Sequence, residues 1–207
     1  MRIHNKLDEI LKHGSKIKIL RFLFAEKDEH TGRSIAEGIG MSPSSTHSTL
    51  QGMKKEGLIS AQKKGNAILY KLQQDNYVVK KLLAPLFEKE KFIYNDIILF
   101  IKKGLLQARS EILSIVVFGS VIRKEETSQS DIDLLVLLKN NAGKLKIDKV
   151  MDKLHVDMVK GFGVSISPYI LTVSEIRQRY SQKKRIIKSI LDNNELIYGE
   201  PIERILA

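Results

Sequence analysis

The stretch that decides the fold is residues 114–138, SIVVFGSVIRKEETSQSDIDLLVLL. An apolar run ends in Gly119-Ser120, ten polar or mixed residues follow, and a second apolar run opens with Asp131-Ile132-Asp133. Apolar runs bounded by turn residues predict two strands, joined here across a short helix or loop. Side chains alternate between the two faces of a strand, so Asp131 and Asp133 share a face and their carboxylates lie side by side.

Beyond these acids the second strand is apolar on both faces, which predicts a central position in a sheet. Two carboxylates at the edge of a core are costly unless a cation or a tight network compensates them. Mg2+ takes carboxylate oxygens together with substrate phosphates, and such a site can align a nucleotide for transfer. Gly119 lets the backbone approach a phosphate, and Ser120 offers it a hydroxyl. The alternative is that the acid pair only discourages aggregation at a strand edge or caps a neighbouring helix.

The order Gly-Ser, ten residues, Asp-x-Asp resembles the signature of the nucleotidyltransferase superfamily related to DNA polymerase beta. The resemblance covers residues 112–171 and is strongest to the minimal, MNT-type members. It implies a mixed sheet with helices and a Mg2+ site with Asp131 and Asp133 as catalytic metal ligands. It also implies that Gly119 and Ser120 hold the triphosphate of an NTP, for which we expect ATP.

One departure from that family concerns a third carboxylate, which active members usually carry on a later strand. The matching stretch here, residues 163–171, is GVSISPYIL, with serines in place of an acid. Asp157 and Glu175 flank this stretch but fall on expected helices. Retained catalysis and a catalytically degenerate site therefore both stay open.

The N-terminal region predicts a helix-turn-helix unit. Thr31 begins one helix, a turn with Gly38 and Gly40 follows, and Ser42-Pro43 starts the next helix with serine as N-cap. In that second helix, residues 44–56, we expect Thr46, Leu50 and Met53 to face inward. Its outward face suits contact with DNA bases and phosphates and carries Ser44, Ser45, His47, Gln51, Lys54 and Lys55.

A hairpin follows, formed by residues 58–63 and 67–72, with Lys63 and Lys64 near its tip and Ile68, Tyr70 and Leu72 expected to point inward. Residues 15–72 thus resemble the winged helix-turn-helix of prokaryotic transcription regulators of the ArsR and MarR kind. The resemblance implies binding of double-stranded DNA. The alternative is a solvated basic face on a module that docks protein.

We predict an α+β protein with three parts: a winged helix-turn-helix at 1–75, a helical connector at 76–109, and a mixed-sheet nucleotidyltransferase-like domain at 110–207. The connector is rich in apolar residues and is interrupted by Pro85. Its surplus of apolar positions favours a homodimer, which would match two-fold DNA sites. After the serine-bearing strand we expect a helix capped by Thr172 or Ser174, then a loop and a short helix after Pro201.

Composition narrows the partners. The 207 residues carry 35 Lys and Arg against 24 Asp and Glu, a net charge of +11 that favours an anionic partner such as nucleic acid. No cysteine is present, which excludes disulfides and thiolate chemistry and agrees with a cytoplasmic location. No apolar run is long enough for a membrane span, and the N-terminus lacks a signal-peptide core, so we expect no membrane contact.

Together these patterns predict a DNA-binding transcription regulator joined to a Mg2+-dependent nucleotidyltransferase domain that passes NMP from NTP to an acceptor. The MNT-type resemblance implies acceptors that include a protein, such as a HEPN-type partner for which this chain is the antitoxin, and small molecules. A second hypothesis is a transcription regulator whose C-terminal domain only senses nucleotide or dimerises. A third has both domains serving protein contacts in a larger assembly.

Overall fold

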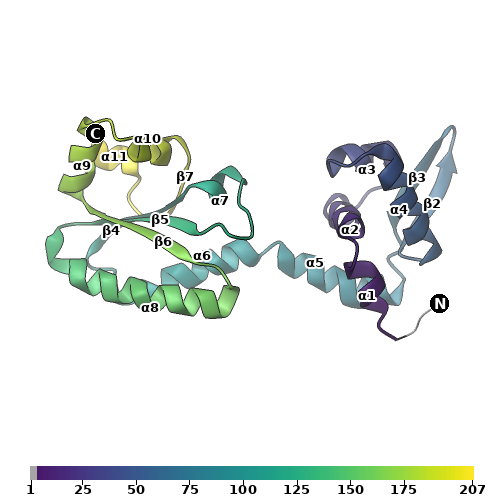
Figure 1. The fold of residues 1–207 in the computed structure, drawn as a ribbon, viewed down its shortest axis with the longest axis horizontal. Helices are drawn as coiled ribbons and strands as arrows, with labels where there is room; N and C mark the ends of the chain where they lie inside the picture. The colour runs from purple at the N-terminus through teal and green to yellow at the C-terminus, as the bar shows by residue number, and fades with distance from the viewer. Residues whose placement is uncertain (1–3) are drawn as a thin grey trace. The chain divides into compact units, whose positions relative to one another are not determined.

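The structure is a computed structural model that describes residues 4–207. The chain divides into two compact units, with the boundary between Ile93 and Tyr94 (Figure 1). This boundary falls inside residues 76–109, the segment expected as a connector, so part of that segment belongs to each unit. The fold is α+β, as predicted. Within residues 4–207, no helix combines the length and apolarity that crossing a membrane requires.

The N-terminal unit is a winged helix-turn-helix, in which helices pack on a small antiparallel sheet with strand order β1-β3-β2 (Figure 1). Leu20, Leu50 and Tyr70 belong to its buried core. Its elements in chain order are α1 Lys6–Leu11, α2 Gly14–Glu26, β1 His30–Thr31, α3 Gly32–Gly38, α4 Pro43–Lys55, β2 Ile59–Lys64, β3 Ala67–Leu72, a π-helical turn Val79–Leu83 and α5 Ala84–Glu90.

Helices α3 and α4 begin where the sequence predicts. The Thr31 hydroxyl accepts a hydrogen bond from the backbone N–H of Ser34 at 3.1 Å, and the Ser42 hydroxyl accepts one from Ser45 at 3.3 Å. Each bond satisfies a donor that the first helical turn leaves unpaired. Pro43 stands in the first turn of α4, where its missing N–H costs nothing. Thr46, Leu50 and Met53 are buried, as predicted.

Ile68 is 42% exposed, so its predicted inward position was wrong. Tyr70 is buried and Leu72 is half-buried, as the alternation along the strand predicted. Ile68 pairs with Lys63 close to the turn of the hairpin, which extends past the helices (Figure 1). The period of the strand thus predicts its inner face but not the length over which helices cover that face.

The C-terminal unit is built on a four-stranded mixed sheet with strand order β6-β5-β4-β7. The strands are β4 Ile112–Phe118, β5 Ile132–Leu138, β6 Ile166–Thr172 and β7 Asn194–Gly199. β5 pairs antiparallel with β4 and parallel with β6, and β4 pairs antiparallel with β7. β5 is therefore internal, and it is fully buried from Leu134 to Leu138, as predicted. β6 lies at an edge, which is where a strand tolerates a residue without an N–H such as Pro168.

Helices cover both faces of this sheet (Figure 1). α6 and α8 pack on the face that carries Val117, Leu134 and Val136. α9, α10 and α11 pack on the opposite face, which carries Phe118, Leu135 and Leu137. The helices of this unit are α6 Ile93–Gly104, α7 Ser120–Arg123, α8 Lys144–Phe162, α9 Val173–Ser181, α10 Arg185–Asp192 and α11 Ile202–Leu206, with 3-10 turns at Leu106–Ala108 and Asn141–Gly143.

Strand β7 was not predicted, because its stretch was expected to be a loop. Its sequence NELIYG places a single buried residue, Ile197, among half-buried and exposed ones, so it carries neither an apolar run nor a clear alternation. Pairing with β4 forms the strand, a tertiary effect that overrides weak local preference. The short helix after Pro201 is present as α11.

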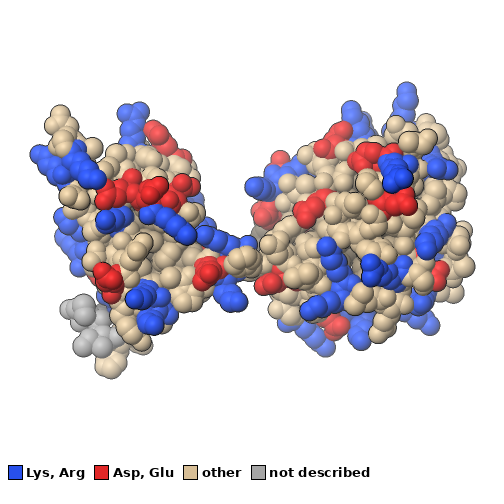
Figure 2. Space-filling model, turned by 180° about the vertical axis from the view of Figure 1, so that it is seen from behind, with Lys and Arg blue, Asp and Glu red and all other residues tan. Residues whose placement is uncertain are grey.

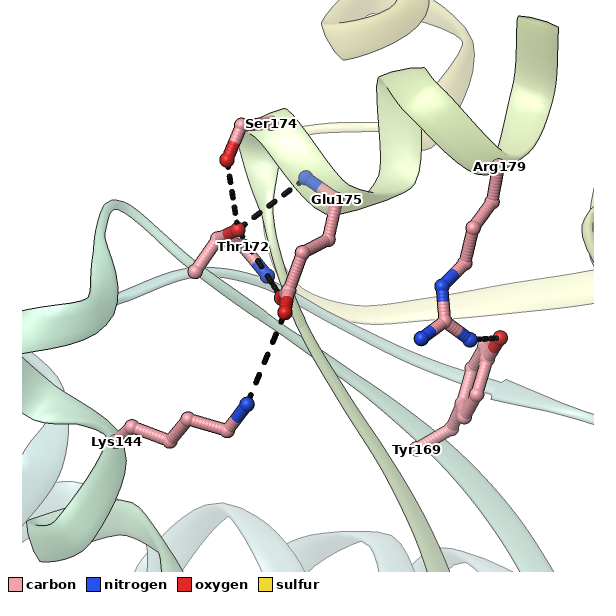
Figure 3. A network of polar contacts seen from close by, with 6 residues as sticks. All are labelled: Lys144, Tyr169, Thr172, Ser174, Glu175 and Arg179. Atoms are coloured by element: carbon pink, nitrogen blue, oxygen red, sulfur yellow. Dashed lines mark hydrogen bonds and ion pairs between the residues drawn. The ribbon is translucent and has the colours of Figure 1, made fainter. Parts of the chain in front are cut away.

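A capping box begins α9 at Thr172, which is one of the two caps, Thr172 or Ser174, that the sequence predicted (Figure 3). The Thr172 hydroxyl accepts a hydrogen bond from the Glu175 N–H at 3.2 Å, and the Glu175 carboxylate accepts one from the Thr172 N–H at 2.7 Å. Lys144 of α8 lies 3.8 Å from the other carboxylate oxygen. These hydrogen bonds to Thr172, with the charges of Lys144 and Arg179, outweigh burial and lower the pKa of Glu175.

We predict that Glu175→Gln lowers the free energy of unfolding by about 0.5 kcal/mol at pH 7, since glutamine keeps a hydrogen bond but loses the charge at the helix start. A lowered pKa contributes stability above the unfolded value, and this contribution is lost as pH falls through the folded pKa. The difference from wild type should therefore be larger at pH 7 than at an acidic pH below the folded pKa of Glu175. Urea unfolding followed by circular dichroism at both pH values measures it, with the exposed Glu126→Gln as control. An equal loss at both pH values would refute the electrostatic cause.

Candidate functional site

The two acids of the Asp-x-Asp motif lie at the open end of the central strand. Asp131 is exposed and Asp133 is half-buried, whereas the rest of β5 is fully buried. Asp133 pairs with Phe118 of β4 on one side and with Ser167 of β6 on the other. It alternates with Leu135 and Leu137, so it stands on the sheet face that α9, α10 and α11 cover.

Gly119 packs against Asp133 at this end of the sheet. Its backbone has φ 82° and ψ −151°, a conformation that side chains resist, and a Cβ atom on it would lie 1.9 Å from Oδ2 of Asp133. Only glycine meets both conditions, so the backbone here is in direct contact with the carboxylate. Ser120 follows as the half-buried first residue of α7. The structure thus brings Gly119, Ser120 and the acid pair to one place.

Burial and the neighbouring Asp131 carboxylate raise the pKa of Asp133, and the charge of Arg123 opposes them. Arg123 itself donates a hydrogen bond to Glu125 at 2.7 Å. Within residues 4–207, neither acid of the pair forms a salt bridge. A carboxylate with a raised pKa stabilises the fold only while protonated, and this contribution is lost as pH rises through the folded pKa. Above its folded pKa the ionised Asp133 therefore destabilises the fold unless a cation compensates its charge.

Among residues 4–207, no third acid stands beside the pair to complete a metal-binding group. In the described part of the chain, no three His, Cys, Asp or Glu residues gather closely enough to hold a metal ion. Ser167 pairs with Asp133 in a parallel register, so its side chain points to the same face. Asp157 lies on α8, in the layer on the other face, and Glu175 is engaged in its capping box. Two carboxylates suit Mg2+ bound with substrate phosphates but not an all-protein cage.

The residues predicted to contact DNA lie on α4 and on the hairpin of β2 and β3. Basic side chains stand at the projecting tip of this hairpin (Figure 2). Of the residues predicted to contact DNA, those with exposed side chains are Ser44, Ser45, His47, Lys54, Lys55, Lys63 and Lys64. Two further contacts were missed from the sequence: Gln51 is half-buried and donates to the Tyr70 hydroxyl at 3.4 Å, and Lys64 pairs with Glu29 at 2.8 Å. Glu29 lies 35 positions away along the chain, so no local pattern indicates the pair.

Fold and site define a winged helix-turn-helix joined to a nucleotidyltransferase-type domain. The family model "Polymerase beta, Nucleotidyltransferase" matches residues 101–203. A Methanocaldococcus jannaschii protein named "Putative protein adenylyltransferase MJ1305" is 30% identical over 111 residues, which are 53% of this chain and 74% of that protein. The chain belongs to this nucleotidyltransferase family related to polymerase beta.

Solved structures with low similarity cover parts of the chain. A winged helix-turn-helix domain from Mycobacterium bovis is 23% identical, covers 44% of this chain and 76% of that one, and has a TM-score of 0.34. A predicted DNA-binding regulator from E. coli is 24% identical, covering 42% and 85%, with a TM-score of 0.36. A toxin-antitoxin complex with AMP-PNP is 15% identical, covering 53% and 80%, with a TM-score of 0.37. The winged helix is defined by its own topology, in which α3 and α4 are followed by the hairpin of β2 and β3.

We predict that Gly119→Ala lowers the free energy of unfolding by about 1–3 kcal/mol. The backbone angle of residue 119 is strained for alanine, and the new Cβ atom would clash with the Asp133 carboxylate. Gly161→Ala is the matched control, since Gly161 lies within α8 and no atom stands within 4 Å of an added Cβ. Urea unfolding of both variants and wild type measures the difference. If Gly119→Ala is as stable as Gly161→Ala, the close packing of Gly119 on Asp133 is wrong.

Proposed function

We propose that this protein is a DNA-binding transcription regulator with a Mg2+-dependent nucleotidyltransferase domain, which binds an NTP and transfers NMP to an acceptor. The single observation that supports it best is the acid pair at the end of β5, in which Asp133 is half-buried against Gly119, Asp131 lies beside it, and neither forms a salt bridge within residues 4–207. A half-buried carboxylate beside a second carboxylate favours a bound cation, because a cation offsets both the burial of Asp133 and the repulsion between the two charges. We place the protein in the cytoplasm, where DNA and NTP are found.

In this proposal Asp131 and Asp133 would hold Mg2+, with ATP as the nucleotide. The bound ion would neutralise charge on the triphosphate and orient it. Gly119 lets the backbone lie close to a phosphate, and the Ser120 hydroxyl donates to a phosphate oxygen. An acceptor oxygen attacks the α-phosphorus, the bond from that phosphorus to the pyrophosphate oxygen breaks, and pyrophosphate leaves with the electron pair. Because Ser167 is no base, the acceptor proton passes to water.

We propose a protein as the acceptor. The name of the M. jannaschii relative supports this choice, since protein adenylyltransfer is the activity that name assigns to it. The MNT-type resemblance makes a HEPN-type partner the first candidate, with this chain as antitoxin.

A second candidate function is a transcription regulator whose C-terminal domain binds nucleotide without turnover. The specific observation that favours it is Ser167, which stands in register with Asp133 where an acid would complete a three-carboxylate site. Nucleotide binding needs only the acid pair and the Gly119-Ser120 bend, whereas transfer also needs an activated acceptor.

We also propose a homodimer that binds double-stranded DNA. Leu82 and Leu86 lie one turn apart near the end of the N-terminal unit and are 41% and 50% exposed. Leu7 and Leu11 of α1 are a second such pair, also one turn apart and exposed. Exposed apolar pairs at helical spacing favour packing against another helix. A second copy would bring two α4 helices to one duplex.

For transfer, we predict that full-length protein with its protein acceptor, Mg2+ and α-labelled ATP gives labelled acceptor. Asp131→Ala/Asp133→Ala should lower the rate at least about 100-fold. The reason is that it removes both proposed metal ligands, and loss of a group that merely orients a metal ligand can already cost up to about 100-fold. Ser167→Asp should raise it. Asp148→Ala/Asp152→Ala, which removes two acids from α8, is the matched control. If wild type and Ser167→Asp both bind nucleotide but neither transfers it, the C-terminal domain is a nucleotide sensor. If the Asp131→Ala/Asp133→Ala variant transfers at the full rate, the acid pair has no role in transfer.

For DNA, we predict that Lys54→Ala/Lys55→Ala lowers the salt-dependence slope of binding to mixed-sequence duplex by about 1.8, because two phosphate contacts are lost. Lys80→Ala/Lys81→Ala, which removes two exposed lysines outside α4 and the hairpin, should leave it unchanged. Lys63→Ala should weaken binding more than Lys64→Ala, since Lys64 must first give up Glu29. Fluorescence anisotropy over a salt series tests this. Equal slopes for both double variants would count against α4 as the DNA-binding helix.

For assembly, Leu82→Glu/Leu86→Glu should convert a dimer into a monomer, because charges placed at the contact cannot be desolvated cheaply. Light scattering after size-exclusion chromatography reports the mass. The control variant Lys80→Glu/Lys81→Glu also introduces two glutamates, at exposed positions next to the proposed contact, and it should remain dimeric. A monomeric wild type would disprove this interface.

A further inference from the structure

The corner between α9 and α10 carries a run of positive charge that neither proposed activity uses. Residues 177–188, RQRYSQKKRIIK, contain six Lys and Arg and no Asp or Glu. The neighbouring helix α8 is also rich in lysine, but there Asp148, Asp152 and Asp157 stand among the lysines. The α9–α10 corner is therefore the stretch of this unit where positive charge is least compensated by its own sequence.

Two of the six cations serve the fold. Arg177 donates to the backbone carbonyl of Ile205 at 3.0 and 3.2 Å. Arg179 donates to the Tyr169 hydroxyl, and its guanidinium lies over the Tyr169 ring (Figure 3). The other four are exposed and, within residues 4–207, form no salt bridge; they are Lys183, Lys184, Arg185 and Lys188.

Three of these cations, Lys183, Lys184 and Lys188, border a cavity of about 530 Å³ formed by residues of α9, of α10 and of the turn between them. Buried Ile187 and half-buried Leu191 form an apolar floor. Tyr180 stands at the rim and is 50% exposed. The remaining lining residues are Ser181 and Asp192. The site thus combines an apolar floor, an exposed aromatic ring and a net positive border.

We propose that this basic corner binds single-stranded nucleic acid. Lysine is depleted at protein–protein interfaces, whereas nucleic-acid interfaces are strongly positive, so the three lysines at the cavity favour a polyanion with phosphates over an acidic protein. An exposed tyrosine beside a basic hollow is the arrangement on which unpaired bases stack. A duplex keeps its bases stacked inside and offers no base face to Tyr180.

The position of the corner relates it to the acid pair. After α10 the chain enters β7 at Asn194, which pairs with Phe118, and Phe118 in turn pairs with Asp133. α9 and α10 cover the sheet face on which Asp133 stands. Nucleic acid bound at the corner would therefore lie on the same side of the sheet as Asp133. Binding itself requires neither metal nor transfer, so the two proposals fail independently.

The test uses full-length protein in a Lys54→Ala/Lys55→Ala background, which removes the proposed duplex contacts of α4, and a labelled single-stranded oligonucleotide of mixed sequence. We expect Lys184→Ala/Lys188→Ala to lower the salt-dependence slope by about 1.4, because two contacts to single-strand phosphates are lost. Tyr180→Ala should weaken binding at least about fivefold at constant salt, through lost stacking. The matched control is Lys146→Ala/Lys160→Ala, which removes two exposed lysines of α8.

Three outcomes would overturn the proposal. One is an equal slope for Lys184→Ala/Lys188→Ala and for its α8 control. Another is unchanged affinity in Tyr180→Ala, which would reduce the corner to a nonspecific charged surface. The third is a labelled polyglutamate peptide that binds more tightly than the oligonucleotide and loses affinity in Lys184→Ala/Lys188→Ala, which would assign the corner to an acidic protein. Circular dichroism of each variant confirms that it is folded.

Discussion

The C-terminal unit depends on one constraint: two carboxylates share the open end of its central strand, and one of them is packed against a glycine backbone. Asp133 fits beside Gly119 only because that residue has no Cβ atom. Burial and Asp131 both raise the pKa of Asp133, so the fold alone does not favour the ionised pair. An arrangement that destabilises the protein by itself is typical of a site that is completed by a ligand. The family membership agrees with this account.

The sequence predicts those features that depend on local chemistry. The strands around the Asp-x-Asp motif, the N-caps Thr31, Ser42 and Thr172, and the buried stripe of α4 each follow from a few neighbouring residues, and each is present. Strand β7 was missed because its pairing with β4 forms it and its own pattern does not. The exposure of Ile68 and the Lys64–Glu29 pair likewise depend on segments far apart in the chain.

The candidate site divides in the same way. The motif predicts its acids and its glycine-serine bend, because both lie within 15 positions of sequence that two strands bring together. The distance between Gly119 and Asp133, and the register that puts Ser167 beside Asp133, come only from the structure. That register identifies Ser167 as the residue beside Asp133 at which an acidic side chain would stand on the same face of the sheet.

The most direct test of the acid pair compares thermal unfolding of wild type and Asp133→Asn at pH 7.5, first in EDTA and then with Mg2+ and a non-hydrolysable ATP analogue. In EDTA the variant should melt higher, because it lacks the ionised carboxylate that the fold disfavours. With Mg2+ and analogue at 100 times Kd, wild type should gain about 2.7 kcal/mol and the variant much less. A variant that melts below wild type in EDTA, or that gains as much from the analogue, would contradict the claim that these acids hold a cation and a phosphate chain.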